Sequence, residues 1–226
     1  YARIARENLF RTVTIEAKNL NMTAEDMVPI LEPELDKLRA KLPPAHRIEF
    51  DGVVKDSKES QASLNANLPL CLAVVMLVLI AQFNSLRRAS IVILTVPLIL
   101  IGAVIGLLVV QANFGFMVIL GLYALAGIIV NNAIVLIDRI DIERKEIEDQ
   151  YEALVHACLR RLRPIIMSTV TTILGLLPLI ISQDALFFGM ASVLAFGLAI
   201  GTLLTLGVVP VLYSLFFNIK KEPGLK

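Results

Sequence analysis

The later part of the chain contains five apolar runs, each long enough to cross a membrane. About 20 apolar residues in a helix span the roughly 30 Å hydrocarbon core of a bilayer. Lipid offers the backbone no hydrogen bonds, so a spanning run must satisfy its own polar groups as a helix. The last run has no polar turn, so we expect one long helix there. The sequence therefore predicts transmembrane helices over about 64–83, 89–110, 114–137, 164–181 and 185–219.

The composition agrees with a membrane protein. Of the 226 residues, 57% are hydrophobic and 18% are charged, whereas soluble domains contain roughly 45–50% apolar residues. A soluble globular domain is therefore excluded. The net charge is +1 and the basic residues are dispersed, so the chain offers no basic stripe for nucleic acid. Cys71 and Cys158 are the two cysteines, too few for a disulfide framework or a zinc site.

Residues 1–63 form a polar segment ahead of the apolar runs. They carry 10 of the 21 Lys and Arg residues and 11 of the 20 Asp and Glu residues. Alternating apolar residues predict strands over 12–17 and 47–51, with a helix between them. This βαβ fragment is too small to be an independent domain. Because the chain begins at Tyr1 without a basic-then-apolar leader, we expect a piece of a longer protein.

The helix expected inside this polar segment has recognisable start and stop signals. Thr23 is suited to cap it, with Asp26 three residues later in a near-capping-box spacing. Pro29 and Pro33 fall early in the helix, so we expect its first part to be irregular. The pair at 43–44 should end it, because proline cannot continue the backbone hydrogen bonds.

Basic residues beside the predicted spans indicate the orientation, since short cytoplasmic loops retain Lys and Arg. The connections around 111–113 and 182–184 carry none. We therefore expect the 1–63 segment outside the cytoplasm and the C-terminus inside it. The eleven basic residues near the other ends of the spans are Arg87, Arg88, Arg139, Arg144, Lys145, Arg160, Arg161, Arg163, Lys220, Lys221 and Lys226.

Residues 141–161, between the third and fourth runs, have one apolar face and one charged face at helical spacing. Such an amphipathic helix is typical of a segment that lies on the cytoplasmic leaflet of the membrane. Packing of the apolar face against another cytoplasmic loop explains the pattern equally well. The apolar positions are Ile147, Tyr151, Leu154, Val155, Cys158 and Leu162.

Two adjacent amides, Asn131 and Asn132, lie in the middle of the third run. Polar residues at membrane depth are costly, so each is a candidate functional residue. Gly127, Asn131 and Asp138 share one helix face, and Gly127 would let another helix approach closely. Asn132 points about 100° away from that face. The alternative is that both amides only form hydrogen bonds between helices.

A polar stripe follows the fourth run through Arg161, Ser168, Thr172 and Gly175. Their spacing places all four on one helix face, where Gly175 is also a candidate for close helix packing. A simpler explanation exists for each member, because Ser and Thr in membrane helices bond back to the i−4 carbonyl and Arg can extend to the interface. Small residues also recur four apart in the second and fifth runs, which predicts close helix packing at Gly102, Gly106, Gly197 and Gly201.

No Asp, Glu, Lys or His lies at mid-membrane in the apolar runs between about 68–137, nor again over 164–181. If the protein uses the proton gradient, its proton-binding carboxylates therefore lie outside these residues. Methionines at 76, 117, 167 and 190 fall on different runs, which argues against a path for soft metal ions. The sequence has no HExxH, GxSxG or intramembrane Asp pair, so we expect neither an enzyme nor a cofactor.

Several segments together resemble the C-terminal part of the resistance-nodulation-division (RND) transporters, in their drug-efflux branch. The similarity covers nearly the whole chain. Each motif is weak alone, but their order and spacing are specific. The segments are Phe50-Asp51-Gly52, Gln82-Phe83-Asn84-Ser85-Leu86, GIIVNNAIVLID at 127–138, Arg161-Leu162-Arg163-Pro164 and Leu174-Gly175-Leu176-Leu177-Pro178.

This resemblance implies a proton-coupled antiporter of twelve helices in the inner membrane of a Gram-negative bacterium. Residues 1–63 would end the second periplasmic porter loop, and 64–226 would form helices eight to twelve, an all-α membrane bundle with a small α+β segment. The implied partners are the N-terminal half of the same transporter, two further copies in a homotrimer, periplasmic adaptor and outer-membrane channel proteins, and membrane lipid.

The resemblance also implies a proton relay. In this family, two Asp residues on one helix are joined to a Lys on a second helix and to a hydroxyl group and an Arg on a third. These last three positions fall on Asn131, Ser168 and Arg161, with Asn132 and Thr172 beside them as further candidates. Asn131 departs from the family Lys, because an amide can bond to a carboxylate without compensating its charge.

The expected function is therefore proton-driven export of amphiphilic small molecules. Two alternatives remain open. The same kind of transporter could export metal ions, lipids or secreted protein. The chain could also be a membrane scaffold subunit that transports nothing, in which polar residues only hold helices together.

Overall fold

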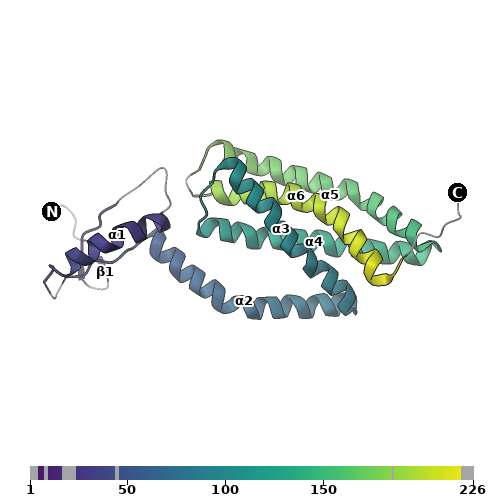
Figure 1. The fold of residues 1–226 in the computed structure, drawn as a ribbon, viewed down its shortest axis with the longest axis horizontal. Coiled ribbons are helices and arrows are strands. Elements are labelled where there is room, and N and C mark those ends of the chain that lie inside the picture. The colour runs from purple at the N-terminus through teal and green to yellow at the C-terminus, as the bar shows by residue number, and fades with distance from the viewer. Residues whose placement is uncertain (1–4, 8–9, 17–23, 44–45, 185, 220–226) are drawn as a thin grey trace. The chain divides into compact units, whose positions relative to one another are not determined.

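A computed structural model of the chain describes residues 5–7, 10–16, 24–43, 46–184 and 186–219 (Figure 1). The chain divides into two compact units, residues 1–58 and 59–226. The sequence predicted a boundary at 63–64, and the boundary in the structure lies five residues earlier, within the helix that joins the two units.

The described residues of the first unit form a short hairpin, a helix and the start of the next helix. Strand β1 (Ala5–Glu7) pairs antiparallel with β2 (Phe10–Thr12). The predicted βαβ arrangement is wrong, because residues 13–16 and 46–51 form no strand. The alternating side chains Val13 and Ile15 are 91% and 89% exposed. Without a neighbouring strand and a buried face, alternation does not produce a strand.

Helix α1 (Ala24–Arg39) is continuous, so the irregular first part predicted from Pro29 and Pro33 is wrong. Each proline removes one backbone hydrogen bond, and the remaining turns of this helix continue past both. The helix ends at Arg39, four residues before Pro43. The predicted cap falls outside the described residues, which exclude Thr23 and the side chain of Asp26.

Five described helices are long and apolar enough to cross a membrane. Three of them contain the predicted runs 64–83, 89–110 and 164–181, and the other two begin two or three residues after the predicted starts at 114 and 185. Within the run 185–219, residues 188–217 form one uninterrupted helix, as predicted. The five are α2 (Val53–Phe83), α3 (Leu86–Val110), α4 (Phe116–Glu146), α5 (Gln150–Ile181) and α6 (Phe188–Phe217).

The separate amphipathic helix predicted over 141–161 is absent. Residues up to Glu146 extend α4, a short turn follows, and residues from Gln150 onward belong to α5 without a break as far as Ile181. Asp149 caps α5, since its Oδ1 accepts hydrogen bonds from Tyr151 N–H at 2.8 Å and Glu152 N–H at 3.4 Å. The amphipathic face is therefore the first third of a longer helix.

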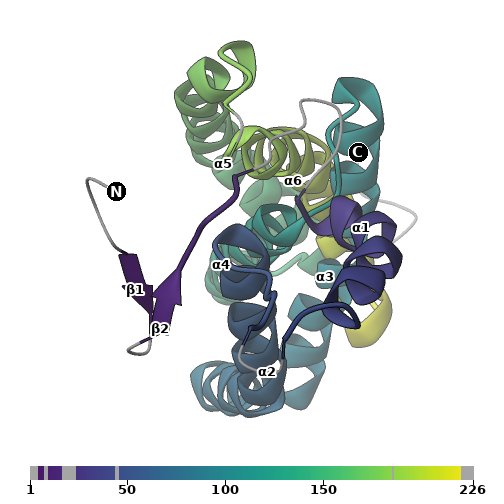
Figure 2. The ribbon, with the colours of Figure 1, turned by 90° about the vertical axis from the view of Figure 1, so that its left-hand side faces the viewer.

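Helix α6 packs against α3, α4 and α5 (Figure 2). Glycines allow this close approach. A methyl group at Gly102 of α3 would lie 3.0 Å from the Cα atom of Gly197 on α6, and one at Gly106 would lie 2.6 Å from Phe196. Leu125 and Ile129 of α4 pack against α6 at Gly197 and Gly201, respectively. Both small-residue pairs found in the sequence thus lie at helix contacts.

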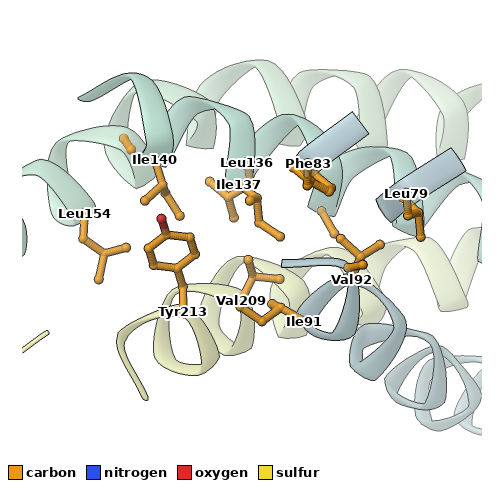
Figure 3. Packing of buried hydrophobic residues seen from close by; sticks show 13 residues of the cluster. Leu79, Phe83, Ile91, Val92, Leu136, Ile137, Ile140, Leu154, Val209 and Tyr213 are labelled. Carbon is orange, nitrogen blue, oxygen red and sulfur yellow. The ribbon is translucent and has the colours of Figure 1, made fainter. Parts of the chain in front are cut away.

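Two groups of buried apolar residues form the core of the second unit. One lies where α4 ends and α5 begins, and Figure 3 shows the Tyr213 ring there beside Ile140 and Leu154. The other includes Ile99, Leu125 and Leu198 from α3, α4 and α6.

Between α5 and α6, the Phe187 and Leu186 N–H groups donate hydrogen bonds to the carboxylate of Asp184. These bonds lower the pKa of that carboxyl group.

Candidate functional site

Asn131 lies on the outer surface of the helical unit. Its neighbours Ile129 and Ala133 are fully buried on the other side of α4, whereas Asn131 is exposed and Asn132 half-buried. The Asn131 amide has no hydrogen-bond partner within the described part of the chain. Gly127, one turn earlier, has no atom within 4 Å of where a methyl group would lie. Gly127 therefore does not serve helix packing among the described residues, contrary to expectation.

Ser168 and Thr172 are likewise exposed, on α5. The Ser168 hydroxyl donates to the Ile165 carbonyl at 2.9 Å, and the Thr172 hydroxyl donates to the Ser168 carbonyl at 2.8 Å. The Thr172 bond is the i−4 bond that the simpler explanation predicted, whereas Ser168 bonds to the carbonyl three residues earlier. Gly175 faces open space as Gly127 does, so its predicted packing role is also absent from the described chain. The stripe contributes no described contact between helices.

We call these two regions the α4 patch (Gly127 and Asn131) and the α5 patch (Ser168, Thr172 and Gly175). Asn131 lies about 22 Å along α4 from the α4–α5 turn, and Ser168 about 27 Å along α5 from it. The two patches are thus at similar distances from that turn.

Arg161 lies on α5 between the α5 patch and the α4–α5 turn. It is half-buried, and its Nε atom is inaccessible with no hydrogen-bond partner among the described residues. The Nε atom of Arg161 is therefore covered by protein, while the side chain as a whole is partly exposed. The charge lies on the same helix as the α5 patch, seven residues before Ser168.

Sequence reasoning missed a buried carboxylate, Glu143 of α4, whose side chain is 1% exposed. Its Oε1 atom accepts a hydrogen bond from Arg139 one turn earlier and lies 3.1 Å from Nη1 of Arg160 on α5. The spacing of Arg139 and Glu143 is a recognisable i, i+4 pair. The contact across helices has no sequence signal.

A second charged network joins α3, α4 and α6. The Tyr213 hydroxyl donates to Asp141 Oδ1 at 2.6 Å and accepts from Arg144 Nη1 at 2.9 Å. Arg88 Nε lies 3.1 Å from Asp141 Oδ2. The Arg88 and Arg144 guanidinium groups both lie over the Phe217 ring, at 5.8 and 5.4 Å from its centre.

A cavity of about 640 Å³ opens beside this network. Arg88, Arg144 and Lys145 line it together with Asp138, Asp141, Glu146 and Glu148. Because both signs of charge are present, the lining favours neither anions nor cations. No group of three or more His, Cys, Asp or Glu side chains suited to a metal ion occurs in the described residues.

Comparison with known proteins identifies clear relatives. The AcrB/AcrD/AcrF family matches residues 2–217 of the chain. The swarming motility protein SwrC of Bacillus subtilis is 33% identical over 221 residues, covering 96% of this chain and 21% of that protein. The nickel-cobalt-cadmium resistance protein NccA of Alcaligenes xylosoxydans is 29% identical over 227 residues, covering 97% of this chain and 20% of NccA.

A crystal structure of a heavy metal efflux pump has a similar fold. The TM-score is 0.68 and the identity 28%, over 88% of this chain and 20% of that chain. In each of these three comparisons, the chain spans about a fifth of its relative's length.

Proposed function

This chain belongs to the AcrB/AcrD/AcrF family of RND transporters, and we propose that it forms the C-terminal membrane part of an exporter driven by the proton gradient. The family and the five apolar helices point to a multi-pass inner-membrane protein. In the proposed orientation, residues 1–63 lie in the periplasm and the C-terminus in the cytoplasm. Of the basic residues that carry the orientation, those of the tail at 220, 221 and 226 lie outside the described residues.

One observation carries the proposal: the α4 and α5 patches are uncovered within the described chain. A polar group facing lipid is costly, so such groups in transporters face other protein or a water-filled path. The inner faces of α4 and α6 are already packed tightly through glycines. The remaining four-fifths of a full-length transporter supplies a natural partner for the outer faces.

In this proposal, the proton is taken up and released by carboxylates on the N-terminal half of the full-length transporter, which we call the missing half. Asn131 bonds to them through its amide and Ser168 supplies a hydroxyl group, with Asn132 and Thr172 as further candidates. Arg161 supplies the positive charge that Asn131 lacks, because a guanidinium group is cationic whereas an amide is neutral. In this proposal, Arg161 rather than a lysine is the positive group that balances the charge of the carboxylates.

The same observation weighs against a scaffold that does not transport. If polar residues only held these helices together, they would lie between them, as Thr169 and Thr202 do with their hydroxyl oxygens 3.1 Å apart. Asn131, Ser168 and Thr172 instead lie outside the described contacts. We also propose a homotrimer that works with periplasmic adaptor and outer-membrane channel proteins, as RND pumps generally do.

Amphiphilic small molecules are the proposed cargo, and metal ions are the second candidate. Relatives of this chain are named both for metal resistance and for multidrug resistance. The names of NccA and of the heavy metal efflux pump favour metal. The described chain itself provides no metal-binding cluster, so a metal path would have to lie in the remainder of the protein.

The test is Asn131→Leu in the full-length transporter, expressed in a host that lacks its own efflux pumps. We expect export to fail at unchanged membrane abundance, because leucine cannot bond to the carboxylates. Asn67→Leu is the matched control, since Asn67 is exposed on α2 and bonds only to the Ser63 carbonyl of its own helix at 2.9 Å.

Dye accumulation and metal tolerance, each with and without a protonophore, are the two readouts. Dye export that the protonophore abolishes supports an amphiphile exporter, and metal tolerance alone supports the second candidate. Export by Asn131→Leu equal to that by Asn67→Leu would remove Asn131 from the mechanism. Inert results with every substrate would favour the scaffold.

A further inference from the structure

Helix α5 is held to α4 by a buried ion pair. The Glu143 carboxylate of α4 is 1% exposed, and both Arg139 and Arg160 direct their guanidinium groups to its Oε1 atom. A buried carboxylate without a positive partner is strongly unfavourable. Arg160 supplies the contact that crosses from α5 to α4, and its own side chain is 57% exposed.

Helix α5 is held to α6 by a second contact. The Thr169 and Thr202 hydroxyl oxygens lie 3.1 Å apart, and the two residues are 7% and 2% exposed. Removing the partner of a hydroxyl group buried among apolar helices destabilises the folded protein, because the hydroxyl is left without a hydrogen bond. This bond thus favours one rotation of α5 about its axis relative to α6.

The two contacts bracket the proposed relay residues of α5. Arg161 directly follows Arg160, and Ser168 directly precedes Thr169. The contacts are about 13 Å apart along the helix axis. Successive helical residues are rotated by about 100°, so fixing two positions fixes the direction of the side chains next to them.

We propose that Arg160 and Thr169 are positioning residues, which set the rotation of α5 and so direct Arg161 and Ser168 toward the carboxylates of the missing half. This inference rests on the proposed function. It adds Glu143, Arg160 and the threonine pair, which do not face the α4 or α5 patch.

The test uses the full-length transporter with Cys71 and Cys158 replaced by serine. Thr171→Cys places a reporter on α5, because Thr171 is exposed and bonds only to carbonyls of its own helix. The rate of maleimide modification at this thiol reports the rotation of α5. Membrane abundance is measured for every variant.

Arg160→Gln and Thr169→Val each remove one contact with little change in volume. We expect both to change the modification rate and to lower proton-driven export by between about tenfold and 100-fold, because small displacements of reacting groups are costly. Arg160→Lys keeps the charge and should restore part of both readouts. Arg163→Gln is the matched control, as Arg163 is exposed on the same helix, and should alter neither.

The inference is overturned if Arg160→Gln and Thr169→Val match Arg163→Gln in both rate and export while Asn131→Leu abolishes export. If the modification rate changes but Asn131→Leu exports normally, the contacts set the rotation of α5 and the proposed function fails instead. The two failures are therefore distinguishable.

Discussion

At the scale of the residue, Tyr213 shows how one hydroxyl group joins two helices. The side chain of this α6 residue is fully buried. Its hydroxyl group donates to Asp141 and accepts from Arg144, both on α4, and the Arg144 guanidinium lies 5.6 Å from the centre of its ring. Hydrogen bonds to charged groups contribute more than those between neutral groups. Loss of this hydroxyl group should therefore weaken the contact between the ends of α4 and α6.

Tyr213→Phe removes the hydroxyl and keeps the ring. We expect it to lower the free energy of unfolding by about 1.5–3 kcal/mol, because two charged groups lose a partner. Thermal denaturation of the full-length protein in detergent measures this, with Tyr123→Phe as the control, since Tyr123 is partly exposed and its hydroxyl group has no partner among described residues. Equal melting temperatures for the two variants would contradict the assigned bonds.

The residues of the patches could be located from sequence, but the residues of the charged networks could not. Asn131 stands out because an amide is rare in an apolar run. Tyr213 and Asp141 are 72 positions apart, and nothing in either segment indicates the other. Their pairing depends on how α4 and α6 pack, which is set by glycines and shape rather than by a local pattern.

At the scale of the element, α5 is longer than a membrane requires. Its 32 residues span about 48 Å, against roughly 30 Å of hydrocarbon. The excess corresponds to the amphipathic part near Asp149. Exposed apolar side chains, including Val155 and Leu159, continue along this part. A straight α5 therefore carries apolar surface beyond the hydrocarbon or crosses the bilayer at a tilt.

Continuity of α5 is measurable as a distance between spin labels at Glu152→Cys and Leu174→Cys, with the native cysteines replaced by serine. A straight helix places the two backbone positions about 33 Å apart. A helix lying on the membrane surface and turning at a right angle near residue 162 would place them about 23 Å apart. We expect the longer distance, and the shorter one would restore the separate amphipathic helix.

Helices were predictable in this chain and strands were not, for a physical reason. A run such as 89–110 must become a helix wherever it meets lipid, because only internal hydrogen bonds satisfy its backbone. The alternation over 12–17 requires a partner strand, which the local sequence does not specify. The division of 141–161 between α4 and α5 followed from the cap at Asp149, which periodicity alone did not indicate.

At the scale of the whole molecule, the described helices bury one set of faces and leave another uncovered. Helix α6 packs against the inner faces of α3, α4 and α5. A methyl group added at Gly102 or Gly106 would displace neighbouring atoms at the contact with α6. The α4 and α5 patches are on surfaces that these contacts do not reach. A chain that spans about a fifth of its relatives' length is expected to leave such surfaces for the remainder.

The central claim is that both patches are covered by protein in the complete transporter. Spin labels at Asn131→Cys and Ser168→Cys in the full-length protein, reconstituted in lipid, test this through collisions with molecular oxygen, which concentrates in the hydrocarbon. Leu203→Cys and Val211→Cys, at exposed apolar sites of α6, provide the comparison. The account predicts low oxygen accessibility at positions 131 and 168, whereas accessibility there as high as at both α6 sites would contradict it.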